Sequence, residues 1–135
     1  MENNELYGTL VLVHPDLKND PAGQQGKVGI LSYIDSSDEI YVGFENGREG
    51  KYSPDALMSL KDKSEIFPDL MANGSKLDLS EYKDLYKISL LQDRGRSTDI
   101  VHALEIAAKN PAIWDKSLVA VDQLLAPRMA QSVGR

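Results

Sequence analysis

The chain is predicted to be an α+β protein, in which a β-rich N-terminal part precedes an α-helical C-terminal part. Residues 9–61 hold short β-branched and aromatic runs separated by Gly, Pro, Asn and Asp, which is typical of antiparallel strands. Residues 77–127 instead place apolar residues three and four positions apart, as on one face of a helix. With 41% hydrophobic and 27% charged residues, most of the 135-residue chain is expected to fold.

Five strands are expected in the N-terminal part, at residues 9–14, 27–34, 39–45, 48–52 and 57–61. The turn-rich segment 15–26 predicts a long exposed loop, and residues 53–56 a single helical turn. Asn46-Gly47 predicts a type I′ hairpin turn, because both residues tolerate positive φ.

Strand register is clear in one strand and open in another. In residues 39–45, Ile40, Val42 and Phe44 share one face, so Tyr41 should point outward. In residues 27–34 two apolar faces compete, because Val28, Ile30 and Ile34 alternate with Leu31 and Tyr33.

The C-terminal part predicts a connector at residues 62–76, with one short helix around 67–72, and then a helical segment at 77–127. Asp78 and Glu81 form a capping box for a helix over 79–94, which Gly95 ends. Ser97 caps a second helix that ends at Lys109. A third helix is expected from residue 111 to 127, and residues 128–135 are expected to fray. The apolar stripe of this third helix is Trp114, Leu118, Val121 and Leu125.

The runs "GKVGILSYIDSSDEIYVGFENG" and "YSPDALMSL" resemble the SH3-like small-barrel group, especially its KOW and Tudor-like members. The matching positions are turn and core residues: Gly26, Gly29, Val42, Phe44, Gly47, Pro54 and Leu57. The resemblance implies a five-stranded SH3-like barrel over about residues 6–61, with two or three main helices packed on it or on a partner. Because turn and core residues carry it, it implies a fold more than a function.

No motif predicts catalysis, a metal site or a cofactor. The chain has no cysteine, and His14 and His102 lie in different parts without a neighbouring ligand. The acidic run 35–39 lacks the glycine and the distal Glu of a calcium loop, so we interpret it as a solvated turn. A strained Gly-x-Ser-x-Gly elbow is also missing from the sequence. The protein is therefore predicted not to be an enzyme.

Charge narrows the choice of partner. The net charge is −6, and residues 1–62 carry five Lys or Arg against eleven Asp or Glu, whereas residues 63–135 carry ten of each. Nucleic-acid binding relies on basic residues, so it is disfavoured although the KOW resemblance implies it. The acidic, polar N-terminus and the absence of a long apolar segment predict a cytoplasmic protein that does not enter a membrane.

The function predicted from the sequence is a non-enzymatic interaction or adaptor module, whose acidic barrel surface binds a basic protein segment. The Tudor-like resemblance implies that outward aromatics can cage a methylated Lys or Arg, but we favour the interpretation that the tyrosines cover the barrel or contact the helices. The candidate surface is Asp35, Asp38, Glu39, Tyr41 and Tyr33. Two alternatives are a nucleic-acid- or ribosome-associated barrel and a structural subunit that forms homo-oligomers through Trp114, Leu118, Val121 and Leu125.

Overall fold

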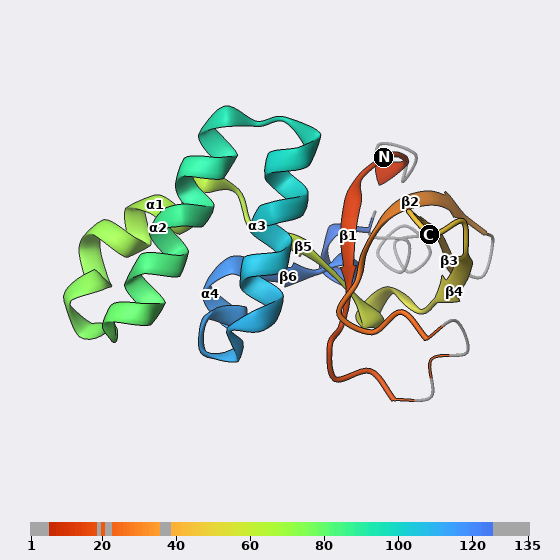
Figure 1. Cartoon of the computed structure of the whole chain (residues 1–135), viewed down its shortest axis with the longest axis horizontal. Coiled ribbons are helices and arrows are strands. Elements are labelled where there is room, and N and C mark those ends of the chain that lie inside the picture. Colours follow the sequence, from red (N-terminus) through yellow and green to blue (C-terminus); the bar gives the residue numbers. More distant parts are fainter. Residues whose placement is uncertain (1–5, 19, 21–22, 36–38, 126–135) are drawn as a thin grey trace, which may run out of the picture.

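The computed structural model describes residues 6–18, 20, 23–35 and 39–125, and it confirms an α+β fold. Figure 1 shows the main helices on one side of the molecule and the strands on the other. The elements in chain order are β1 (Leu10–Val13), β2 (Val28–Ile34), β3 (Ile40–Phe44), β4 (Glu49–Tyr52), η2 (Pro54–Ala56), β5 (Leu57–Leu60), α1 (Lys63–Asn73), η3 (Gly74–Lys76), α2 (Leu79–Arg94), α3 (Ser97–Lys109), η4 (Pro111–Ile113), α4 (Trp114–Ser117), β6 (Leu118–Ala120) and η5 (Val121–Leu124).

The strands of the described residues form one antiparallel sheet in the order β4-β3-β2-β1-β5-β6. All five predicted strands are present, but the prediction of a closed barrel is wrong, because the sheet is open with β4 and β6 at its edges. The reason lies in β6, which pairs with the outer edge of β5 through Ser59 and Val119. Both edges of β5 are then occupied, so β5 cannot also pair with β4.

The hairpin between β3 and β4 is where the sequence places it, but its turn differs from the predicted type. The Gly47 N–H donates to the Phe44 carbonyl and the Phe44 N–H to the Arg48 carbonyl, each at 2.9 Å. The loop therefore has three residues, with Gly47 in the left-handed conformation at φ 85°. This is the hairpin in which a tight turn is followed by a glycine bulge.

A bulge settles the register of β2. Leu31 pairs with Val42 and Tyr33 pairs with Tyr41, so Ser32 is an extra residue of β2 that has no paired residue on β3. Leu31 and, beyond the bulge, Ile34 are both buried, whereas Tyr33 is exposed. The inner face of β2 thus takes Leu31 from one predicted apolar set and Ile34 from the other. The bulge causes this change, because one extra residue reverses the alternation of side chains from that point on.

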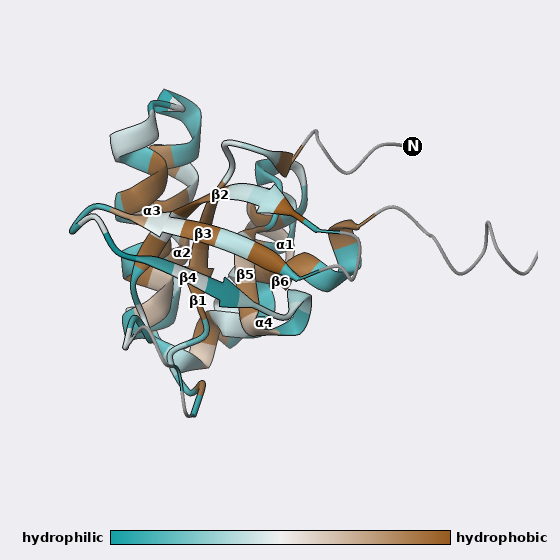
Figure 2. Ribbon diagram, turned by 90° about the vertical axis from the view of Figure 1, so that its right-hand side faces the viewer, coloured by the Kyte–Doolittle hydropathy of each residue, from teal (hydrophilic) through white to brown (hydrophobic). Residues whose placement is uncertain are grey.

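Two apolar clusters meet at β1. The cluster enclosed by the sheet, here called the sheet core, includes Val11 and Val13, while the cluster between the sheet and the helices, the helical core, includes Leu12. Alternate side chains of one strand thus enter different cores. Figure 2 shows the sheet toward the viewer with the helices behind it. The helix α3 contacts β1, β5 and the start of β2, and the helices leave the rest of β2 and most of β3 uncovered on that side.

The helices α2 and α3 confirm the predicted spans of residues 79–94 and of a second helix ending at Lys109. Gly95 ends α2 in the left-handed conformation at φ 70°, as expected of a C-terminal glycine. The helix α1 begins at Lys63, earlier than the predicted start near residue 67. Ile66, which precedes the predicted span, is buried in the helical core, and its packing there extends the helix toward its N-terminus.

The predicted third helix over residues 111–127 is wrong. The chain forms η4 and α4 and then becomes extended at Leu118, which starts β6. A continuous helix would place Leu118 and Val121 on one face, whereas here Leu118 is buried in the helical core and Val121 in the sheet core. The helix therefore ends before Leu118, so that Leu118 and Val121 can point to opposite sides of the segment and enter different cores.

Candidate functional site: the outer face of β2 and β3

The solvent side of β2 and β3, here called the outer face, carries large exposed side chains. Ile30 is 50% exposed and Tyr33 is 53% exposed. In β3, the burial pattern alternates and leaves Tyr41 and Gly43 on the outer side, as the sequence predicts for Tyr41. Exposed aromatic and aliphatic groups that gather on one sheet face are typical of a binding surface.

Three tyrosines lie together at one end of the outer face. The ring centroids of Tyr7 and Tyr33 are 6.0 Å apart, and those of Tyr33 and Tyr41 are 5.9 Å apart, with both pairs tilted. We call these residues the tyrosine cluster. Tyr7 is 41% exposed. Its place in the cluster does not follow from the sequence, because it precedes the first strand and belongs to no periodic pattern.

A lysine of the same chain already lies against the tyrosine cluster. The ammonium of Lys51 is 3.5 Å from the Glu39 carboxylate and 5.8 Å from the centroid of the Tyr41 ring. Glu39 first, and then Tyr41, raise the pKa of Lys51 above its usual value. The Glu39 N–H donates to the Asp35 carboxylate at 3.0 Å. This end of the outer face therefore stabilises a positive charge.

Four of the five predicted surface residues thus come together: Tyr33, Tyr41, Asp35 and Glu39. The fifth, Asp38, lies outside the described residues. Tyr52, the third tyrosine predicted on a strand, instead belongs to the sheet core and is 4% exposed.

The predicted helix interface does not form one surface. Leu118 and Val121 are 4% and 1% exposed and lie in different cores, while Trp114 and Leu125 are partly buried. The Trp114 indole N–H donates to the Ala107 carbonyl at 2.8 Å. These side chains therefore pack within the chain itself. They do not form the exposed apolar stripe that the alternative of a homo-oligomeric structural subunit requires.

The other end of the outer face forms a cleft against α3, here called the α3 cleft. Its apolar part has a volume of about 590 Å³ and adjoins a second hollow of about 800 Å³. Four residues line both parts and make them one cleft: Val28, Phe44, Glu45 and Val101. The cleft arises because α3 covers β1 but ends its contact with the sheet near β2.

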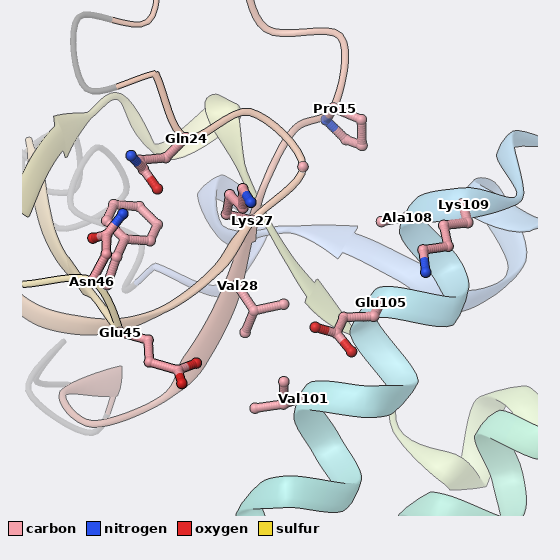
Figure 3. Close-up of a pocket in the computed structure, with 12 residues that line it drawn as sticks. Pro15, Gln24, Lys27, Val28, Glu45, Asn46, Val101, Glu105, Ala108 and Lys109 are labelled. Carbon is pink, nitrogen blue, oxygen red and sulfur yellow. The ribbon is translucent and has the colours of Figure 1, made fainter. Parts of the chain in front are cut away.

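The charges of the α3 cleft are mixed (Figure 3). The carboxylates of Glu45 and Glu105 lie on opposite walls around Val28, whereas Lys109 lies toward the end of the cleft next to Pro15. In the part of the chain that the structure describes, no ion pair involves Glu45 or Glu105. Both carboxylates are thus available to a ligand with a positive charge.

The α3 cleft was not predicted from the sequence, although strand β2 carries a sign of it. In the sequence, Val28 and Ile30 belong to one of the two apolar sets that compete for the inner face of β2. The structure places them on the outer side, where Val28 is half-buried and Ile30 exposed at the cleft. Apolar residues on both faces of a strand that is not fully buried indicate a second contact surface.

Among the described residues, no cluster of three or more His, Asp or Glu side chains could hold a metal ion, and no helix is long and apolar enough to cross a membrane. His14 uses its Nδ1 atom to accept the Asp16 N–H at 3.0 Å, and its ring contacts Trp114 edge-on.

No protein-family model matches the chain, and comparisons with curated proteins and with solved structures found no significant match. The resemblance to SH3-like barrels stays a prediction.

Proposed function

We propose that this protein is a non-enzymatic interaction module, and that the outer face of β2 and β3 binds a basic segment of a partner protein. The observation that carries the proposal is the position of Lys51 against Tyr41 and Glu39. A surface that accommodates an ammonium group of its own chain has the aromatic and acidic groups that a partner's Lys or Arg requires.

The distribution of charge supports the same partner chemistry. The excess negative charge of the whole chain lies in residues 1–62, which include the outer face. A basic segment would be attracted to this half of the molecule at long range. Single contacts of this kind are weak at exposed sites, at about 0.5–1 kcal/mol for a cation over an aromatic ring. The partner segment is therefore proposed to carry more than one basic residue.

The test is the binding of fluorescent peptides measured by anisotropy. Peptides rich in Lys and Arg should bind, acidic peptides of equal length should not, and added salt should weaken binding. Tyr33→Ala should reduce the affinity about two- to fivefold, the equivalent of one exposed cation–aromatic contact. Tyr86→Ala is the matched control, because Tyr86 is 43% exposed but lies on α2, away from the sheet.

The variant Lys51→Gln is expected to have the opposite effect on affinity to Tyr33→Ala. Removal of the internal ammonium leaves Glu39 and Tyr41 to the peptide alone, so the affinity for basic peptides should rise. Equal binding of basic and acidic peptides, or unchanged affinity in both Tyr33→Ala and Lys51→Gln, would contradict the proposed function.

A further inference from the structure

Gly43 is an unexplained glycine in the middle of β3. It pairs with Ile30 on one side and Glu49 on the other, and glycine weakens a strand interior because it has no side chain to pack. The strand itself does not require it: a Cβ atom added at Gly43 would meet no atom within 4 Å. Gly29 differs, since its Cβ would lie 2.5 Å from the Val42 side chain.

The space above Gly43 is part of the α3 cleft. Gly43 lines its apolar part, together with the partly exposed Ile30 and with Val101 of α3 on the opposite wall. A glycine within a strand often marks a place where another molecule approaches the backbone closely. The chain's own atoms leave this space open, so the missing side chain points to a ligand.

The α3 cleft is continuous with the tyrosine cluster. Ser32 lines the cleft, and its hydroxyl donates to the Tyr41 carbonyl at 3.0 Å. Tyr41 and Gly43 are two residues apart on the same side of β3, which corresponds to about 7 Å along an extended strand. One extended segment can therefore contact both places at once.

We propose that the α3 cleft binds a bulky aliphatic or aromatic side chain of the partner segment, with Gly43 as the floor of the site. This inference rests on the proposed function and specifies the partner further. The segment is extended and carries a Lys or Arg two to four positions from its apolar anchor. The basic residue faces Tyr41 and Glu39. Glu45, which lines the apolar part of the cleft, favours a second positive charge beside the anchor, away from Lys27 and Lys109, which line only the adjoining hollow.

The test fills the cleft and leaves the tyrosine cluster intact. Gly43→Val places a branched side chain where there is room and suits an extended strand. Ala72→Val is the control, because it adds the same side chain to the exposed surface of α1. Val101→Ser is a second cleft variant, on the opposite wall, in case Gly43→Val perturbs folding. Thermal unfolding is compared for all of them before binding is measured.

A displayed library of random twelve-residue peptides is selected on the full chain. We expect enrichment of a bulky apolar residue with a Lys or Arg two to four positions away. The affinity of a selected peptide should fall about tenfold or more when its apolar residue is replaced by Ala, as for a buried interface anchor. Gly43→Val and Val101→Ser should weaken binding of the intact peptide, and Gly43→Val should have little effect on the Ala-substituted one.

The outcomes separate this inference from the proposed function. Selected peptides that are basic without an apolar anchor, and that bind wild type, Gly43→Val and Val101→Ser equally, would overturn the inference and leave the proposed function in place. Apolar peptides without basic residues would overturn the proposed function and, with it, the basic half of the inferred segment. No enrichment over an unrelated protein would overturn both.

Discussion

Tyr52 connects the segment between β1 and β2 to the sheet. Its hydroxyl donates to the Asp20 carboxylate at 2.9 Å, and the same carboxylate oxygen accepts the Gln24 N–H at 3.0 Å. Gln24 is itself buried. Burial of the phenol, followed by its hydrogen bond to Asp20, raises the pKa of Tyr52 far above its usual value. The contact therefore stabilises the folded chain only while the phenol is protonated.

We predict that Tyr52→Phe lowers the free energy of unfolding by about 1–3 kcal/mol at neutral pH, as for a hydrogen bond to a charged group. The tyrosine pKa is about 10 in the unfolded chain and higher in the folded one. The contribution is therefore complete below about pH 10 and decreases as the pH rises above it. Urea unfolding of both proteins at neutral pH and near pH 11 measures the difference, which should be smaller at the higher pH. A constant difference would contradict this assignment.

Individual residues were predictable wherever the signal was local. Gly95 and the position of the hairpin at Gly47 were predictable, because helix ends and turns depend on a few neighbouring residues; the type of the turn was not. The role of Tyr52 was not, because its partner Asp20 is 32 positions away. The tyrosine cluster was partly predicted, since Tyr41 follows from strand alternation, whereas Tyr7 approaches Tyr33 only in the folded chain.

The segment from Pro111 to Leu125 shows where a helical pattern was misleading. Apolar residues at positions 114, 118, 121 and 125 fit a helix stripe, yet they also fit a short helix, a strand and a final turn that contact two cores. Periodicity cannot separate these arrangements in a segment this short. The edge of β5 decides in favour of a strand, because its backbone N–H and C=O groups need partners and β6 supplies them.

We predict that Leu118→Ala lowers the free energy of unfolding by about 2–5 kcal/mol, because it leaves a cavity in the helical core. Leu124→Ala, six residues further along the chain, should change it by no more than about 0.5 kcal/mol, because Leu124 is 42% exposed. Urea denaturation of the two variants provides the measurement. Similar losses in both would mean that Leu118 is not anchored in the core as described.

Across the whole molecule, β1 joins the sheet to the helices. Leu12 is fully buried among the helices, while its neighbours Val11 and Val13 are fully buried within the sheet. A strand with both faces buried cannot leave one core without exposing the other. The two cores are therefore expected to unfold together.

We predict a single cooperative unfolding transition for the chain. Helix content by far-ultraviolet circular dichroism and the fluorescence of Trp114, which contacts His14 after β1, should give coincident urea curves. Leu12→Ala should shift both curves together, with a loss of about 2–5 kcal/mol. Curves that separate in the variant or in the wild type would show that the cores unfold independently.

The sequence by itself determined the five N-terminal strands, the helices α2 and α3, the outward position of Tyr41 and the acidic half of the chain, because alternation, capping and composition are local properties. Only the tertiary structure decided that the sheet is open, that β6 replaces a helix, and that α3 and the outer face enclose a cleft above Gly43. These features depend on which edges and faces remain uncovered after the other elements have packed. Contacts between residues far apart in the sequence decide which edges and faces remain uncovered, and the local sequence pattern does not encode those contacts.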